Sequence, residues 1–450
     1  MAGRLSACAP DMLLPHLMPR AHCAFAPLAV SAALATALLL CSTALLAQSA
    51  KEQAARTTTA NGATYKRPAA GKGLASRQAV KDGEAEARLI EIYKLAGLSK
   101  AREALVKAER LVSDYPNFQL AQLVYGDLLA AQARPLRTLG DVPESEAKAG
   151  AITLAELRQE SLMRLKALRE RPVAGTIPSQ FLALSPRNKH AIAVDASRAR
   201  LYLFENTETG LKLLGDYYIS VGKSGIEKTV EGDSRTPLGV YFVTSNLDPR
   251  SLKDFYGSGA LPINYPNQLD VKRGKTGSGI WLHGTPPAQF ARAPLASDGC
   301  VVLANPDLER IIRTVEVRST PVVIAQKLQW VAQQSVRADS KSFEDALHSW
   351  QQARSSGDLT ALTSLYSNDF NSYGKSLADW TILLRGEADK IRGRRVQLKD
   401  LSYLRWTDST DTMVVTFGEV PSGARTGPVR RQYWIRQGNQ WKIFFEGVIG

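Results

Sequence analysis

The spacing of apolar residues changes along this chain, and that change limits the folds open to it. Between residues 84 and 133 apolar side chains recur every three to four residues, as in amphipathic helices. From His190 onward they alternate every second residue, as in half-buried strands. At 450 residues the chain is also long enough for two to four domains. We therefore expect a multidomain protein that is helical first and β-rich afterwards.

The helical part is predicted to cover residues 82–175. Its apolar stripes favour three helices, and a further amphipathic helix is expected at about Ile152 to Arg169. The stretch from Ala96 to Pro116 resembles a tetratricopeptide-type helical hairpin. Because barely more than one repeat is present, a ligand-binding solenoid is not supported. We interpret the region as a tetratricopeptide-like packing or dimerisation element.

Residues 187–327 are predicted to form a β-rich domain. A turn at Asp195–Arg198 separates two alternating segments, Ala191–Val194 and Leu201–Phe204, and indicates a hairpin. Further short strands alternate with long loops that contain Gly and Pro. They are expected at Tyr217–Val221, Gly239–Thr244, Ile280–His283, Val301–Leu303 and Pro321–Ile324.

The last unit is predicted at residues 341–450, after a helix-prone join near Leu328–Val336. Its helices are expected at Ser342–Arg354, Leu359–Tyr366 and Ser376–Arg392, and its strands at Leu398–Trp406, Thr412–Glu419, Val429–Arg436 and Trp441–Gly447. Gln437-Gly438-Asn439 is a good turn for the last hairpin. Helices followed by a curved antiparallel sheet predict an α+β cone.

The N-terminus, residues 1–50, reads as a targeting segment. From Pro27 to Ala47 the sequence is almost wholly apolar and uncharged, which is typical of an export signal or an N-terminal anchor. We interpret Met18 as the translation start, with Ala47-Gln48-Ser49 as a small-residue cleavage site. At about 20 apolar residues an uncleaved membrane span is the alternative. Both interpretations put the rest of the chain outside the cytoplasm.

The formal charge of +14 is unevenly distributed. Residues 51–81 contain seven basic residues and one acidic residue, with few large apolar side chains. This composition predicts a basic flexible linker. Because nearly half of the excess charge lies in the linker and not on a folded face, a nucleic-acid-binding function is disfavoured.

The cysteines restrict the chemistry further. Three of the four, Cys8, Cys23 and Cys41, lie in the targeting segment, and Cys300 is the fourth. No disulfide can then form within the exported part, and a cysteine-rich zinc site is excluded. We predict neither a metal nor a cofactor.

Cys300 follows Gly299, and His283 lies seventeen positions upstream. A free thiol is mostly protonated at neutral pH, and a neighbouring imidazole can take its proton or stabilise the thiolate. Glycine lets the backbone approach closely, so that amides near Cys300 could face a developing oxyanion. From the residue types alone, a buried structural cysteine and a core histidine remain the alternatives.

From about His190 to Ala325 the chain resembles the L,D-transpeptidase catalytic domain, also called YkuD. The shared motifs are His283-Gly284, Ser297-Asp298-Gly299-Cys300, Ser220-Val221-Gly222 and Thr236-Pro237-Leu238-Gly239-Val240-Tyr241. In that family the motif cysteine attacks the carbonyl between the third and fourth residues of a peptidoglycan stem peptide. D-alanine is released, and an amine or water then attacks the acyl-thioester. The resemblance implies that Cys300 is the nucleophile, His283 the general base, and Gly284 the backbone carbonyl that orients His283.

Two positions depart from the family pattern. Asp298 stands where most members have His, and Val302 where many have Arg. Asp298 would repel an anion, or could orient His283 or an acceptor ammonium. Together with Gly259-Ala260-Leu261-Pro262 and Arg292-x-Pro294, the Asp298 form of the motif resembles a YafK-like branch of the family. That branch includes enzymes that cleave peptides instead of joining them. Arg292 is a candidate for binding a substrate carboxylate, with a loop salt bridge as the alternative. The predicted substrate-binding set is Gly299, Ser297, Asp298 and Arg292.

Residues 341–450 resemble the NTF2-like fold. A YkuD domain followed by an NTF2-like domain is also similar to the cell-shape-determining L,D-carboxypeptidases of curved bacteria. We find no convincing acid–base set here. The aromatic and basic residues either line a ligand pocket or form an ordinary core with a basic rim: Trp350, Tyr366, Trp406, Tyr433, Trp434, Trp441, Arg430, Arg431 and Arg436.

The resemblances together imply a peptidoglycan L,D-transpeptidase of the bacterial periplasm, either soluble or anchored in the inner membrane. The acceptor could be another stem peptide, an outer-membrane lipoprotein lysine, a free D-amino acid or water. Hydrolysis by an L,D-carboxypeptidase or L,D-endopeptidase is the first alternative, and a non-catalytic wall-binding scaffold is the second. The sequence determines neither the acceptor nor the oligomeric state.

Overall fold

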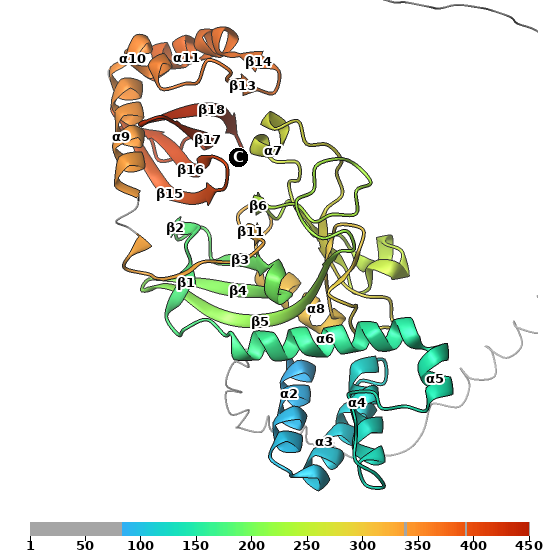
Figure 1. Cartoon of the computed structure of the whole chain (residues 1–450). Coiled ribbons are helices and arrows are strands. Elements are labelled where there is room, and N and C mark those ends of the chain that lie inside the picture. Colours follow the sequence, from blue (N-terminus) through green and yellow to red (C-terminus); the bar gives the residue numbers. More distant parts are fainter. Residues whose placement is uncertain (1–82, 337–339, 392–393, 450) are drawn as a thin grey trace, which may run out of the picture. The chain divides into compact units, whose positions relative to one another are not determined.

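The computed structural model describes residues 83–336, 340–391 and 394–449 (Figure 1). All of these residues belong to one compact unit. The predicted targeting segment and the basic linker at 51–81 lie outside the described residues. Within the described ranges, no helix combines the length and the hydrophobicity that a membrane crossing requires.

The N-terminal region is helical, as its apolar spacing predicts. The helices are α2 (Glu84–Gly97), α3 (Ala101–Asp114), α4 (Gln119–Ala130), α5 (Glu144–Ala149) and α6 (Ala151–Arg169). Leu89, Ala104 and Leu111 are fully buried, because the apolar stripes of α2 and α3 pack against each other. The likeness to a tetratricopeptide hairpin stays a prediction.

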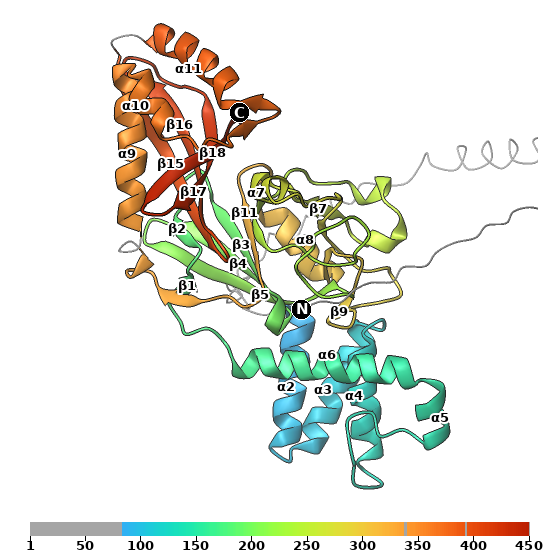
Figure 2. The same ribbon diagram turned by 45° about the horizontal axis from the view of Figure 1, so that its top comes forward.

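Helix α6 contacts both the other helices and the β-rich domain (Figure 2). The Tyr93 hydroxyl of α2 and the Ser161 hydroxyl of α6 are hydrogen-bonded at 2.8 Å. Near the end of α6, Lys166 Nζ donates to the carbonyl of Ser197 at 3.1 Å. Ser197 belongs to the short 3-10 turn η1 (Ala196–Arg198) of the β-rich domain. Helix α6 thus connects the helical region to that domain.

The β-rich domain is built on a nine-stranded sheet in the order β6-β11-β3-β4-β5-β10-β8-β7, with β9 beside β5. Its strands are β3 (His190–Asp195), β4 (Arg200–Thr207), β5 (Gly210–Gly222), β6 (Gly239–Phe242), β7 (Ala260–Pro262), β8 (Trp281–His283), β9 (Leu295–Ser297), β10 (Val301–Leu303) and β11 (Pro321–Ala325). The other elements are η2 (Pro249–Ser251), η3 (Asp254–Tyr256), α7 (Gln268–Lys272) and α8 (Asn305–Thr314). The predicted hairpin is β3–β4.

Strand β5 begins earlier than the predicted strand at Tyr217–Val221. Its first half also pairs with β4, through a register shift between Leu203 and Phe204. The sequence there, Leu213-Leu214, breaks the alternation of apolar and polar residues. The bulge accommodates this break, since it moves one residue out of register. Periodicity alone therefore underestimates the strand.

The prediction of a helix-prone join near Leu328–Val336 is wrong. It contains β12 (Trp330–Ala332), which pairs antiparallel with β1 (Thr176–Pro178). The Trp330 ring packs edge-on against Tyr202 at 4.9 Å between centroids. We attribute the extended backbone to this tertiary contact, which outweighs a weak local helix propensity.

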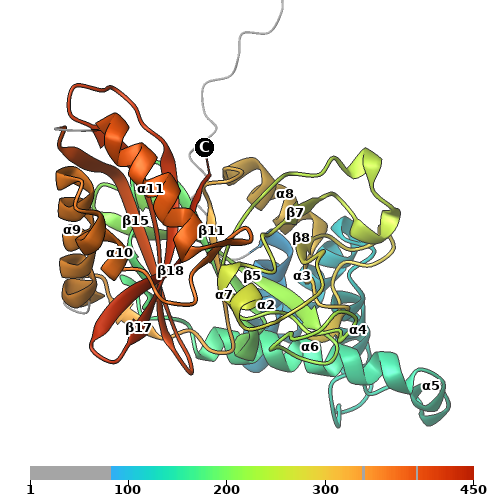
Figure 3. The ribbon, with the colours of Figure 1, turned by 90° about the horizontal axis from the view of Figure 1, so that it is seen from above.

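The C-terminal domain has its helices first and its strands last, as predicted. The helices are α9 (Lys341–Ser356), α10 (Leu359–Ser364) and α11 (Leu377–Ile391). The strands are β13 (Asn371–Ser372), β14 (Lys375–Ser376), β15 (Val396–Thr407), β16 (Asp411–Pro421), β17 (Val429–Gln437) and β18 (Gln440–Val448). Figure 3 shows α9 to α11 on one face of the curved sheet. This is an NTF2-like α+β fold.

The sheet of the C-terminal domain has a fifth strand from another part of the chain. Its order is β18-β17-β16-β15-β2, where β2 (Phe181–Ala183) precedes the β-rich domain in the sequence. Phe181 is 2% exposed and belongs to one apolar core with Phe204 and Trp434. The β-rich and C-terminal domains therefore share a core.

Candidate active site

Parallel pairing of β8 and β10 brings together the two halves of the predicted site. The register places Val301 opposite Leu282 and Val302 opposite His283. His283 ends β8, and Cys300 immediately precedes β10. The thiol and the imidazole, seventeen residues apart in sequence, thus lie on adjacent strands.

The His283 imidazole is almost fully buried, at 1% exposure. Its Nδ1 lies 2.7 Å from the carbonyl oxygen of Gly284. Because a carbonyl only accepts, Nδ1 carries the hydrogen in this bond, and the lone pair of the neutral ring is on Nε2. Burial lowers the pKa of His283 to about 4; the Gly284 bond opposes that shift and the charge of Arg292 adds to it. At neutral pH the imidazole is a neutral base.

Aromatic side chains explain why His283 is desolvated. The ring centroid of Tyr256 lies 5.1 Å from that of His283, and that of Phe255 lies 5.8 Å away. Tyr256 also packs against Trp281, with 4.9 Å between centroids. Sequence reasoning did not identify Phe255 or Tyr256, because they lie in a loop and a 3-10 turn where hydrophobic periodicity carries no signal.

The Cys300 thiol is half-buried and is the one free cysteine in the described part of the chain. Its Sγ donates to the carbonyl of Gly279 at 3.5 Å, and it also has a hydrogen bond with the backbone of Trp281. No thiol–imidazole hydrogen bond is present among the described residues. The thiol is therefore held by the backbone of the segment that enters β8.

The electrostatic surroundings keep the thiol protonated. Burial raises the pKa of Cys300, and the charge of Asp298 adds to this. The backbone of Trp281 and the cations Arg292 and Lys228 act in the opposite direction and are outweighed. The resting site is thus a neutral thiol beside a neutral imidazole, and not a thiolate–imidazolium pair.

The turn before Cys300 requires glycine. Gly299 has a φ of +122°, and a Cβ at this position would lie 2.7 Å from the carbonyl oxygen of Arg235. The Ser297 hydroxyl accepts from the Gly299 amide at 3.1 Å and donates to the Cys300 carbonyl at 2.6 Å. Thr236 Oγ1 donates to the Gly299 carbonyl at 2.9 Å. These bonds hold the backbone that carries Cys300.

The predicted substrate-binding residues Ser297 and Asp298 occupy different environments. Ser297 is 2% exposed, and its hydroxyl is engaged within the turn. The Asp298 side chain is 72% exposed and pairs with Lys223 Nζ at 2.6 Å. Asp298 makes no hydrogen bond to His283 in the described structure, so the orientation of His283 comes from Gly284.

Arg292 is a buried cation that pairs with no carboxylate of the described residues. It is 9% exposed, and its guanidinium carbon lies 4.4 Å from the ring centroid of Phe255. The loop salt bridge considered from the sequence is not formed within the described ranges. Burial lowers the pKa of Arg292, and its charge acts on both Cys300 and His283. This arrangement is suited to binding a substrate carboxylate close to the thiol.

Asn305 is a positioning residue at the start of α8. Its Oδ1 accepts from the amides of Ser258 and Thr285 at 3.0 and 3.1 Å, and its Nδ2 donates to the Thr285 carbonyl at 2.9 Å. A Cβ on Gly284 would lie 2.0 Å from Oδ1. Asn305 therefore holds the loop that orients His283.

No cluster of three or more His, Cys, Asp or Glu side chains able to hold a metal occurs in the described parts of the chain.

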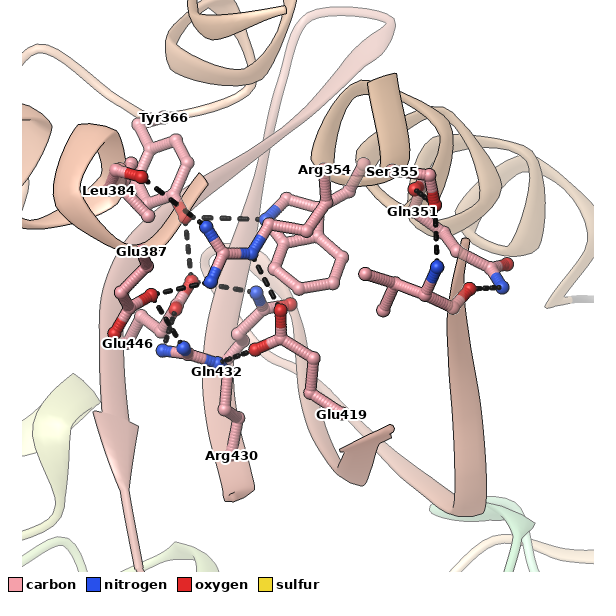
Figure 4. Close-up of polar contacts among 12 residues, drawn as sticks. Gln351, Arg354, Ser355, Tyr366, Leu384, Glu387, Glu419, Arg430, Gln432 and Glu446 are labelled. Carbon is pink, nitrogen blue, oxygen red and sulfur yellow. Dashed lines mark hydrogen bonds and ion pairs between the residues drawn. The ribbon is translucent and has the colours of Figure 1, made fainter. Parts of the chain in front are cut away.

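The interior of the C-terminal domain is occupied by ion pairs (Figure 4). Arg354 pairs with Glu419 at 2.6 Å, and Arg430 pairs with Glu446 at 2.8 Å and with Glu387 at 2.7 Å. Arg430 also bonds Glu419. Trp350, Tyr366, Tyr433, Trp434 and Trp441 are buried core residues. For these residues the structure supports the core interpretation and not a pocket lining.

Two family models match this chain. Residues 189–324 match the L,D-transpeptidase catalytic domain, YkuD. Residues 342–447 match the Cds6 C-terminal NTF2-like domain. The YafK-like branch stays a prediction. A search of curated proteins finds no match.

Solved structures resemble this chain. Bd1075 of Bdellovibrio bacteriovorus is 24% identical, with a TM-score of 0.52 over 61% of this chain and 98% of that chain. The helical cell shape determining protein Pgp2 of Campylobacter jejuni is 19% identical, with a TM-score of 0.48 over 64% of this chain and 99% of that one. At such identities the likeness to Bd1075 concerns the fold alone.

Proposed function

Because residues 189–324 belong to the L,D-transpeptidase catalytic domain family, making this a cell-wall enzyme of that family, we propose that it transfers peptidoglycan stem peptides through Cys300. The observation that carries the proposal is the parallel pairing of β8 and β10, which sets Cys300 and a neutral His283 on neighbouring strands. The exported location that the N-terminal sequence predicts, the periplasm, is part of the proposal.

In the first half-reaction the Cys300 sulfur attacks the carbonyl carbon of the third stem residue while His283 Nε2 takes the thiol proton. The amide bond to the fourth residue breaks. The imidazolium returns the proton to the leaving nitrogen, so that D-alanine departs as an amine and an acyl-thioester remains. The neutral state of both groups supports proton transfer during attack instead of a preformed thiolate.

Arg292 is proposed to hold the carboxylate of the terminal D-alanine. No carboxylate of the described residues pairs with its guanidinium, and its charge acts on the thiol and the imidazole. A carboxylate bound there would replace the solvation that burial removes from Arg292. The same contact would place the scissile bond near Cys300, which favours substrates with a free C-terminus.

In the second half-reaction an acceptor amine attacks the thioester carbonyl, and His283 takes its proton as the thiol leaves. With an amine on another stem peptide the product is a crosslink; with a lipoprotein lysine it is an anchored lipoprotein. Water in the same position makes the protein an L,D-carboxypeptidase or, with a crosslinked substrate, an L,D-endopeptidase.

Mass spectrometry of purified exported chain with disaccharide tetrapeptides, with and without an acceptor stem, tests the proposal. We expect an acyl-enzyme adduct on Cys300, release of D-alanine, and a crosslinked product when the acceptor is present. Cys300→Ala should form no adduct. His283→Gln should slow adduct formation by at least 100-fold. His348→Gln, at an exposed histidine of α9, is the matched control and should retain full activity.

D-alanine release without any crosslinked product would overturn the proposed transferase activity and would favour hydrolysis of the acyl-enzyme. If Cys300→Ala kept full cellular activity, the catalytic proposal would fail in favour of a wall-binding scaffold.

A further inference from the structure

Arg430 and Arg431 are neighbours on β17 with opposite environments. Side chains alternate across a strand, so the two residues face opposite sides of the sheet. Arg430 points into the ion-pair network of the C-terminal domain, where glutamates compensate its charge. Arg431 points toward β6 of the β-rich domain, with its guanidinium carbon 3.3 Å from the ring centroid of Phe242.

Arg431 is buried without an acidic partner. It is 9% exposed, and its Nε donates to Thr416 Oγ1 at 3.0 Å. No carboxylate of the described residues pairs with it. Burial lowers the pKa of Arg431 to about 10, partly offset by Tyr433 and Tyr373. Moving an unpaired charge out of water is costly, and an incoming anion would relieve that cost.

Arg431 lines a pocket of about 290 Å³ that is strongly basic. Four further cations line the same pocket: Arg187, Arg318, Lys399 and Arg425. Asp400 is the one acidic residue among the lining residues, and it pairs with Arg187 at 2.6 Å. Most of the positive charge is therefore uncompensated by acidic residues of the pocket. The pocket shares no residue with the site around Cys300.

We propose that this pocket binds a small oxyanion, a carboxylate or a phosphate, with Arg431 as its buried anchor. The planar guanidinium matches the geometry of either group, and the exposed cations at the pocket's rim raise the local concentration of anions. The site lies beyond the proposed transpeptidase function and does not depend on it, because Cys300 takes no part in it.

Isothermal titration calorimetry and thermal unfolding of the full exported chain test the site. The probes are inorganic phosphate, acetate and a stem tetrapeptide, with sodium chloride at equal ionic strength as the reference. Only binding that Arg431→Gln weakens belongs to this pocket, because the site around Arg292 is itself proposed to bind the tetrapeptide. Such binding of phosphate alone would identify a phosphate source, and such binding of acetate or the tetrapeptide a carboxylate source. Each probe that binds should raise the melting temperature above that measured in sodium chloride.

Three variants make the test specific. Arg431→Gln should weaken binding at least tenfold and remove the rise in melting temperature. Arg385→Gln removes the same charge from an exposed position on α11 and should leave binding unchanged. Cys300→Ala should also bind normally, which shows that the measured signal does not come from reaction at the thiol.

Equal binding by Arg431→Gln and the unmodified chain would overturn the proposal, and so would effects of all probes that match those of chloride. If Arg431→Gln does not fold, the exposed double variant Arg318→Gln/Arg425→Gln decides. It should weaken binding several-fold at an unchanged melting temperature without ligand, and unchanged binding would refute the site.

Discussion

At the scale of single residues, the site combines two neutral groups whose ionisation is set by burial. His283 loses its proton more readily than an ordinary histidine, and Cys300 holds its proton more firmly than an ordinary thiol. A substrate that displaces water from the site would therefore contact a protonated Cys300 thiol and a neutral His283 imidazole. The negative charge on sulfur and the positive charge on the imidazole would develop only during attack.

The reactivity of Cys300 in the free protein follows from its raised pKa. We expect the rate of alkylation by iodoacetamide to increase with pH and to keep increasing beyond the range where an ordinary thiol is half-ionised. The sign follows because burial favours the neutral thiol, so the thiolate forms only at higher pH. Peptide-resolved mass spectrometry of the Cys300 peptide measures the rate. A plateau below about pH 7 would indicate a thiolate–imidazolium pair instead.

Gly299→Ala should disable the turn that carries the nucleophile. The positive φ is strained for alanine by roughly 1–3 kcal/mol, and the added Cβ meets the Arg235 carbonyl. We expect loss of D-alanine release together with a lower urea midpoint of unfolding. Gly126→Ala in α4 is the control, because its Cβ would have no neighbour within 4 Å. Similar activity of the two variants would contradict this role of Gly299.

At the scale of elements, a buried ion-pair network joins the helical region to the β-rich domain. Glu86 of α2 pairs with Arg164 of α6 at 3.0 Å and with Arg200 of β4 at 2.7 Å. Arg200 also pairs with Asp216 of β5 at 2.5 Å. Burial would raise the pKa of Glu86, but the charges of Arg200 and Arg164 outweigh it and hold the pKa below its usual value.

The helices also support the loop that carries Arg292. Phe118 stacks on Phe290 with 4.2 Å between ring centroids, and the Phe290 amide donates to the Asn117 carbonyl at 3.1 Å. Tyr218, whose ring lies 4.0 Å from the guanidinium carbon of Arg164, donates its hydroxyl to the Arg292 carbonyl at 2.8 Å. The helical region thus acts as a packing element that braces the active-site loop.

Glu86→Gln should therefore destabilise the protein strongly. Arg164 keeps its pair with Glu160 and Arg200 keeps its pair with Asp216, but both lose their ion pair with Glu86, and breaking a buried pair typically costs about 3–5 kcal/mol. Urea unfolding followed by circular dichroism measures the change. Glu144→Gln, in the exposed pair with Lys148, is the control and should have no measurable effect. A similarly small effect at Glu86 would show that the network is not a stabilising contact.

At the scale of the whole molecule, the β-rich and C-terminal domains are joined by more than the chain between them. Strand β2 completes the C-terminal sheet through pairs of Tyr403 with Ala183 and of Leu404 with Phe181. Arg273 also forms an ion pair with Asp408 at 2.7 Å. Since one apolar core spans both domains, we infer that they fold as a single cooperative unit.

A chain ending at residue 340 should therefore fold poorly. It would expose Phe181, Phe204 and Phe242, which are at most 3% exposed in the full chain. We expect aggregation or a greatly lowered melting temperature, and one coincident unfolding transition by fluorescence and circular dichroism for the full chain. A truncated protein that melts within a few degrees of the full chain would contradict the shared core.

The sequence by itself determined the order of the domains, the class of each, and the two residue types on which the chemistry depends. Those properties are local, because hydrophobic periodicity and short motifs each depend on residues that are close together in the sequence. The sequence could not assign the strand at Trp330, the pairing of β2 with β15 or the hydrogen bonds of Asn305 to the loop after His283. Each of these depends on contacts between residues far apart in the chain.

Tertiary structure alone decided the ionisation of the site and the partners of its charged residues. Arg292 and Arg431 look like other arginines in sequence, and so does Arg430, yet only Arg430 is neutralised by glutamates. Burial and the identity of distant neighbours make that difference, because the cost of a charge depends on the solvent and counter-charges around it. The apolar pattern thus predicts the order and fold class of the domains. Packing decides which polar side chains remain without a counter-charge.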